Sequence, residues 1–234
     1  MMQMLQSAEP LAHPPLRNAL VIARLKQFTK QMFPFAVPVA SAVRHQFSKR
    51  KIQRLLRERS EISVEVGAGD KRGQGEWITV DLGRNCDIRW DLRRGLPFPD
   101  RTLQKIYSSH FFEHLSFSEA QTFLEECQRA LIPGGKFLIC VPNARIYIEA
   151  YVSGRSLDEG TYFQFAPAYN HTTRMDYVNY MAYMGGHHKY MFDEENLLHI
   201  LRAKGFRNCR LRPFDPALDR RERDFESFYA EAEK

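Results

Sequence analysis

Cysteine is scarce in this sequence, with four residues in 234, and no two of them form a CxxC pair. Their scatter excludes a disulfide framework and a cysteine-based zinc site, and it is typical of reduced thiols in a cytosolic protein. No apolar run approaches the roughly 18–20 residues of a membrane span. The start of the chain lacks the basic and apolar regions of a signal peptide. We therefore predict a cytoplasmic location and no transmembrane segment. The cysteines are Cys86, Cys127, Cys140 and Cys209.

Acidic residues are scarce in the first 60 positions, where only Glu9 and Glu58 stand against eleven lysines and arginines. The positive net charge, +6 overall, therefore lies mainly in this segment. Apolar spacing predicts helices over 16–32 and 40–59, and three prolines within 1–15 predict a disordered lead. We interpret the cations as solvated helix faces; weak contact with anionic lipid headgroups, or with nucleic acid, is the less favoured alternative. The predicted parts are a lead over 1–15, a helical extension over 16–60 and a main domain over 61–234.

A dinucleotide-binding fingerprint is also missing. Two short β-branched apolar runs, 62–66 and 77–80, flank the turn Gly67-Ala68-Gly69, as expected of buried parallel strands. Arg72 stands where that fingerprint has its third glycine or alanine. The connection also leaves no room for the helix that would hold a pyrophosphate. A phosphate-bearing dinucleotide is therefore disfavoured.

Acidic residues around this turn indicate a different cofactor. Glu65 and Asp70 would repel phosphate, but they suit a cationic nucleoside cofactor that has none. Asp81 ends the second run and can accept hydrogen bonds from both ribose hydroxyls. The alternative is a plain turn between strands with acids that face water, and this stretch alone does not decide between the two.

The rest of the chain predicts a mainly parallel sheet, because strands and helices alternate along it. The expected elements are strands over 87–90, 105–109 and 136–141, a helix over 118–131 that a Pro-Gly-Gly turn at 133–135 stops, and two antiparallel last strands over 207–212 and 226–232. The segment 143–192 interrupts this alternation and holds eight of the ten tyrosines. These tyrosines suit packing, or stacking on a sugar or aromatic acceptor.

The connections between the first three strands are unusually short. About ten residues join the first two strands and fewer join the next two, whereas a parallel crossover needs roughly a dozen and contains a helix. We therefore expect one flank of the sheet to lack its helical cover. The hypothesis is that the two N-terminal helices supply it.

Four stretches in order, VEVGAGD, ITVDL, DLRRGLPFPDRTLQKIYSSHFFEHL and ALIPGGKFLICVPN, resemble the class I S-adenosylmethionine-dependent methyltransferases. The resemblance is to the type 11 group, in particular to bacterial members that modify polysaccharides and sugars. It implies an α/β, Rossmann-like, mainly parallel seven-stranded sheet with a C-terminal antiparallel strand. The N-terminal helical extension and the reduced helices between the first three strands come in addition.

The same resemblance implies S-adenosylmethionine as the cofactor and assigns residues to it by matching position. Lys71 departs from the family, because many relatives have a third glycine there. The implied cofactor-binding residues are Glu65, Gly67, Ala68, Gly69, Asp81, Leu82, Asp91, Leu92, Ser109 and His110.

The letters His110-Phe111-Phe112-Glu113-His114 also match HxxEH, an inverted zinc-protease motif. That motif needs one continuous helix, but here the first histidine directly follows a predicted strand, so we reject it. Some quinone-type methyltransferases with a similar acid-histidine pair bind a divalent ion there; we predict no metal in this chain. These side chains are expected to form the rim of the cofactor pocket. The simpler alternative is a helix start with hydrogen-bonded histidines.

A histidine can deprotonate an acceptor hydroxyl near neutral pH. The candidate bases are His110, His114 and His187; the adjacent His188 is interpreted as part of a glycine-rich hinge. The predicted function is O-methylation of a sugar or polysaccharide-precursor hydroxyl, with a small-molecule or glycan acceptor. The alternatives are a quinone or small aromatic acceptor, and a non-catalytic S-adenosylmethionine-binding scaffold. RNA is disfavoured, because no NPPY-type motif or catalytic cysteine pair occurs.

Overall fold

A computed structural model of the chain describes residues 36–165 and 173–234, with the backbone alone for 36–44. The predicted lead over 1–15 and helix over 16–32 lie outside the described residues. The chain divides into two units, Met1–Arg44 and His45–Lys234, and all seven strands of the sheet lie in the second.

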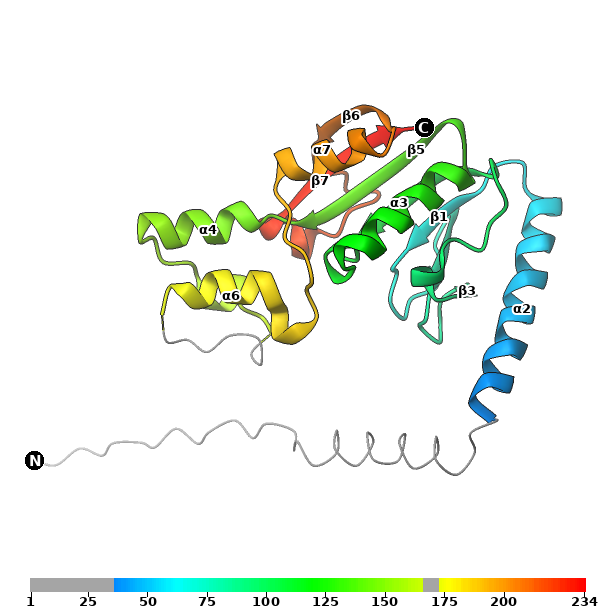
Figure 1. The fold of residues 1–234 in the computed structure, drawn as a ribbon, viewed down its shortest axis with the longest axis horizontal. Coiled ribbons are helices and arrows are strands. Elements are labelled where there is room, and N and C mark those ends of the chain that lie inside the picture. Colours follow the sequence, from blue (N-terminus) through cyan, green and yellow to red (C-terminus); the bar gives the residue numbers. More distant parts are fainter. Residues whose placement is uncertain (1–35, 166–172) are drawn as a thin grey trace, which may run out of the picture. The chain divides into compact units, whose positions relative to one another are not determined.

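One seven-stranded sheet organises this unit, in the order β3-β2-β1-β4-β5-β7-β6 (Figure 1). Strands β1 to β5 pair in parallel, whereas β7 runs antiparallel to both β5 and β6. This is the predicted fold class. The strands are β1 (Ser63–Val66), β2 (Trp77–Asp81), β3 (Ile88–Arg89), β4 (Leu103–Ser109), β5 (Leu131–Pro142), β6 (Arg207–Arg212) and β7 (Ser227–Glu233).

The helices lie where the sequence supplies caps and apolar faces. In α3, Ser116 and Glu119 form a capping box, and Phe123 and Leu124 are buried on the sheet. Asp193 caps α7 by accepting a hydrogen bond from the amide of Asn196. The helices are α2 (Ala36–Glu58), α3 (Phe117–Ala130), α4 (Ala144–Ser153), α5 (Glu159–Tyr162), α6 (Met175–Tyr183) and α7 (Glu194–Ala203), with 3₁₀ turns η1 (Leu92–Arg94), η2 (Phe112–His114), η4 (Met184–Gly186) and η5 (Arg221–Glu226).

Strand β5 is longer than predicted. It begins at Leu131, which pairs with Leu103, and the register then shifts before Lys136 pairs with Lys105. The Pro-Gly-Gly segment therefore forms a bulge within the strand and does not separate it from α3. Gly134 takes a left-handed φ of 76° there, which glycine adopts without strain.

The two faces of the sheet are covered differently. Alternate residues of a strand point to opposite faces, so Ile106 lies in the main core while Tyr107 lies in a second cluster. Phe214 and Leu218, from the β6–β7 connection, pack on this second cluster. No helix joins β1 to β2 or β2 to β3, as predicted, and in the described part of the chain a loop covers the face that lacks crossover helices.

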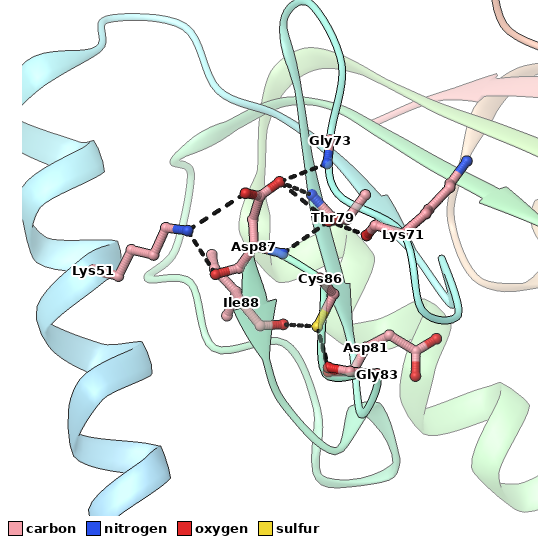
Figure 2. A network of polar contacts seen from close by, with 9 residues as sticks. All are labelled: Lys51, Lys71, Gly73, Thr79, Asp81, Gly83, Cys86, Asp87 and Ile88. Atoms are coloured by element: carbon pink, nitrogen blue, oxygen red, sulfur yellow. Dashed lines mark hydrogen bonds and ion pairs between the residues drawn. The ribbon is translucent and has the colours of Figure 1, made fainter.

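Helix α2 packs at the β3 edge, and a polar network around Asp87 joins it to the sheet (Figure 2). The Asp87 carboxylate accepts hydrogen bonds from the amides of Gly73 (2.8 Å) and Thr79 (3.2 Å). Lys51 of α2 reaches the same carboxylate at 3.4 Å, and Ile52 enters the main core. The predicted helix over 40–59 therefore packs at the β3 edge with the main core, whereas the β6–β7 connection covers the face that lacks crossover helices. The network ties both short connections to the helix.

The tyrosine-rich insertion forms its own cluster, in which α4 and α6 lie side by side beyond the end of β5 (Figure 1). Tyr147, Tyr177 and Tyr180 are buried in it, while Tyr151 and Tyr183 are exposed. Tyr169 lies outside the described residues. Packing therefore accounts for the three buried tyrosines.

Candidate active site

The glycine turn after β1 lies against one wall of a cavity of ≈ 470 Å³ at the carboxyl edge of the sheet. Gly67 has a φ of 68°, and a Cβ there would lie 2.2 Å from Cγ of Phe111, so only glycine fits. A Cβ on Gly69 would meet nothing within 4 Å. The backbone of the turn is therefore open to a ligand on that side.

Seven of the ten residues predicted to bind the cofactor line this one cavity. They come from the ends of β1, β2 and β4, which parallel pairing brings to the same edge. The Asp81 carboxylate accepts hydrogen bonds from the amides of Gly69 (2.8 Å) and Leu82, which fixes its orientation. The seven are Glu65, Gly67, Ala68, Gly69, Asp81, Ser109 and His110.

The other three predicted cofactor residues do not line the cavity. Leu82 is exposed, and Leu92 is buried in the main core. Asp91 caps η1 and forms an ion pair with Arg93 at 2.9 Å. Its hydrogen bonds to the Arg93 guanidinium lower the pKa of the Asp91 carboxyl, against the opposing effect of burial.

Glu65 and Lys71 form an ion pair of 2.5 Å at the cavity wall. Lys71 stands where many of the methyltransferases that the sequence resembles have a third glycine, and here it places a cation directly beside the Glu65 carboxylate. A second cavity of ≈ 460 Å³, beneath the β6–β7 connection, shares Glu65, Lys71 and Arg220 with the first.

His110 is nearly buried, with a left-handed φ of 49°. Ser227 donates its hydroxyl proton to the Arg223 carbonyl (2.6 Å), so His110 Nε2, 2.7 Å away, donates to the Ser227 oxygen. The lone pair is then on Nδ1, which lies 3.7 Å from Oε1 of Glu113. Burial, and next the charge of Arg223, lower the pKa of His110 to about 3. The ring is neutral, and its lone pair faces Glu113.

His114 presents its lone pair differently. Its Nδ1 donates to the His187 carbonyl at 2.9 Å, which leaves the lone pair on Nε2. The side chain is 40% exposed and lines the cavity. Burial lowers the pKa of His114, so the ring is neutral near pH 7. The imidazole of His187 is exposed and is not part of the cavity lining.

Glu113 and His188 complete this histidine cluster. Both carboxylate oxygens of Glu113 are buried without a hydrogen-bond partner, and burial raises the pKa of Glu113 to about 8. His188 is buried against His114, with ring centroids 5.1 Å apart. Burial lowers the pKa of His188 to about 4. The ligand atoms of Glu113, His114 and His188 lie within 4.8 Å of one another.

Three site features escaped the sequence analysis. Arg220 and Arg223 line the cavity, but in the sequence they belong to a mixed charge run that is typical of a solvated loop. The only sequence signal for His188 was that it follows another histidine, His187. Only glycine fits at position 83, because a Cβ there would lie 2.1 Å from the Gly69 carbonyl oxygen. The sequence around Gly83 does not reveal this requirement, because Gly69 lies far from it along the chain.

The family described as "Methyltransferase domain" matches residues 39–211, which is more than half of the chain. The chain belongs to this family. It is a methyltransferase domain of the S-adenosylmethionine-dependent class, and S-adenosylmethionine is its cofactor.

A Mycolicibacterium smegmatis protein named "Probable S-adenosylmethionine-dependent methyltransferase" is 42% identical over 59 residues, which are 24% of this chain and only 22% of that protein. A methyltransferase structure from Archaeoglobus fulgidus is similar over 81% of this chain and 94% of its own, with 17% identity and a TM-score of 0.47. A methyltransferase structure from Mesorhizobium loti is similar over 74% of this chain and 90% of its own, with 17% identity and a TM-score of 0.47. The family assignment rests on the domain match.

Among the described residues, no helix combines the length and the apolarity that crossing a membrane requires.

Proposed function

We propose that this domain methylates a hydroxyl oxygen of a sugar or polysaccharide precursor. One observation carries the proposal: a single cavity holds both the glycine turn with Asp81 and the imidazole of His114. The cofactor side and a neutral base thus share one space, as direct transfer between two bound reactants requires.

The residues of the turn fit the cofactor. The open side of Gly69 admits a ligand against the backbone. Asp81 uses one lone pair of each oxygen for the amides of Gly69 and Leu82 and keeps others for ribose hydroxyls. Glu65 offers a negative charge to a cationic ligand, in competition with Lys71. Each of these roles is part of the proposal.

His114 is the proposed base, in preference to His110 and His187. When bound, S-adenosylmethionine supplies an activated methyl group that passes from its sulfur to the acceptor oxygen and leaves S-adenosylhomocysteine. Nε2 of His114 takes the proton that the hydroxyl loses. The His187 carbonyl holds the ring in the tautomer that this needs. His110 acts through its hydrogen bond to Ser227 and shapes the cavity wall.

The polar cavity rim supports a sugar over a quinone. Of its side chains, eight are charged or imidazole groups and one, Phe111, is aromatic. Arg220 and Arg223 form part of this rim at the side near His110. Hydroxyl-rich acceptors match such a surface through hydrogen bonds. The four cysteines are unbridged, which supports the proposed cytoplasmic place of the reaction in polysaccharide biosynthesis.

The test has two parts. Calorimetry with S-adenosylmethionine and S-adenosylhomocysteine measures cofactor binding by the full chain. Radiolabelled methyl transfer is then measured on nucleotide sugars and oligosaccharides, and in parallel on quinols and catechols. We expect incorporation into the sugar set. Incorporation only into quinols or catechols would replace the acceptor class, and binding with no turnover on any acceptor would favour a scaffold.

A further inference from the structure

The histidine cluster beside the cavity has the composition of a metal site. Glu113 and His114 come from η2, and His188 lies 74 residues further on, just after η4. The three are brought together because the backbone carbonyl of Glu113 accepts the amides of Lys189 (2.8 Å) and Tyr190 (3.3 Å). The structure thus fixes the segment that bears His188 against the turn that bears the other two.

Backbone carbonyls set the direction of both imidazoles. His114 donates Nδ1 to the carbonyl of His187, and His188 donates Nδ1 to the carbonyl of Met181 at 2.8 Å. Each ring therefore keeps its lone pair on Nε2. Metal-bound histidines almost always have such an outer partner, which fixes the tautomer that coordinates.

The Glu113 carboxylate is the independent observation. It is 2% exposed, and neither oxygen has a hydrogen-bond partner. Its Oε1 lies 3.7 Å from His110 Nδ1 and 3.8 Å from His114 Nε2, both beyond hydrogen-bond distance. Native proteins leave few buried polar groups unpaired, and one that remains needs an explanation such as an unseen ion.

We propose that Glu113, His114 and His188 bind one divalent transition-metal ion, with Zn²⁺ as the first candidate. Two imidazoles and one carboxylate form a three-ligand set that leaves a coordination position open. Zinc bonds of about 2.0–2.2 Å would place the ligand atoms about 3.4 Å apart. The present separations, all within 4.8 Å, need only small side-chain movements to reach this.

The open position would lie on the His114 side, because His114 lines the cavity while Glu113 and His188 are buried. There the ion would hold the acceptor oxygen and lower the pKa of its hydroxyl. With Nε2 of His114 bound to the ion, the hydroxyl proton would pass to water in the cavity, and His114 would act as a metal ligand in place of the base proposed above for the metal-free domain. This last step rests on the proposed function, whereas metal binding does not.

The experiment uses the full chain after chelator treatment and dialysis. Metal content after Zn²⁺ loading, calorimetric Zn²⁺ titration and the visible absorption of bound Co²⁺ are measured. The wild type should bind one equivalent. Glu113→Gln and His188→Ala should each weaken binding at least tenfold. His187→Ala is the matched control, since its imidazole is exposed, its carbonyl remains, and binding should not change.

Circular dichroism and S-adenosylmethionine binding check that each variant is folded. A wild type that retains no stoichiometric metal, or equal losses in His187→Ala and His188→Ala, would overturn the site. If either core variant fails to fold, the Co²⁺ spectrum of the wild type still decides between imidazole-carboxylate ligation and no binding. Metal binding without any methyl transfer would keep the site and reject the proposed function. Transfer that is unaffected by metal removal would reject the role of the ion.

Discussion

Two carboxylates with opposite surroundings distinguish the flank of the sheet from the buried histidine cluster beside the cavity. Asp87 accepts hydrogen bonds from Gly73 and Thr79 and an ion pair from Lys51 (Figure 2). Glu113 accepts none. Burial acts on both and would raise both pKa values. At Asp87 the hydrogen bonds and the Lys51 charge outweigh burial and lower the pKa, whereas at Glu113 burial prevails and raises it to about 8.

The difference distinguishes a polar group that stabilises the fold from one that has no partner within the protein and can bind a ligand. At the flank no crossover helix is present, and Asp87 holds the connections in place of one. A satisfied carboxylate of this kind stabilises the fold. Glu113, in contrast, is buried beside the cavity without a hydrogen-bond partner. A buried polar group of this kind does not stabilise the fold unless a ligand binds to it. We therefore expect changes at the first site to affect stability, and changes around the second to affect function.

The largest expected effect is on folding stability, from Asp87→Ala. Loss of the carboxylate leaves the amides of Gly73 and Thr79 without their acceptor, so the free energy of unfolding should fall by about 2–3 kcal/mol. Chemical denaturation measures it. Glu58→Ala, which removes an exposed ion pair to Arg54, should have a much smaller effect, because solvent screens that pair. If both variants lost the same free energy of unfolding, the proposed structural role of Asp87 would be wrong.

At the cavity, we expect a substitution to change the rate of methyl transfer and not the stability of the fold. His114→Ala should lower the rate of methyl transfer roughly 100-fold, as is typical for loss of a general base or of an oxygen-orienting group, with cofactor affinity nearly unchanged. Single-turnover methyl transfer and calorimetry measure the two quantities. Asp87→Ala, assayed at a temperature where it is folded, should keep its rate. If His114→Ala retained the full rate, another group would have to accept the proton, and the assignment of His114 would be wrong.

Much of the fold follows from local signals in the sequence. The β-branched runs and the glycine turn predict β1 and β2, and the helix predicted over 118–131 corresponds to α3. The parallel order then predicts that Glu65, Asp81 and Ser109 meet at one edge, as they do. The strand-end residues could be placed because a sheet converts sequence order into spatial neighbours.

The rest depended on contacts between distant segments. The resemblance assigns Leu92 to cofactor binding, yet its side chain is buried in the core, because η1 turns it inward. His188 meets Glu113 only through backbone hydrogen bonds that no local pattern announces. Arg220 and Arg223 became cavity residues because the β6–β7 connection folds over the helix-free face. Charge runs and histidine doublets carry no such information by themselves.

The stability that Asp87 supplies should also depend on pH. Its folded-state pKa is lowered, so the contribution is fully present above the unfolded value of 3.8 and is lost as the pH falls through the folded value. The stability difference between wild type and Asp87→Asn should therefore shrink below about pH 4. Denaturation curves at pH 3, 4, 5 and 7 measure it. A difference independent of pH would assign the effect to shape alone.

The smallest effect separates the Lys51 charge from the other partners of Asp87. The Lys51 side chain is 46% exposed, so its 3.4 Å ion pair is screened by solvent. Lys51→Ala should lower the free energy of unfolding by about 0.5 kcal/mol, less at high salt. Lys49→Ala, an exposed neighbour on α2, is the control. A loss as large as that of Asp87→Ala would mean that the helix contact, and not the amides of Gly73 and Thr79, holds the flank of the sheet together.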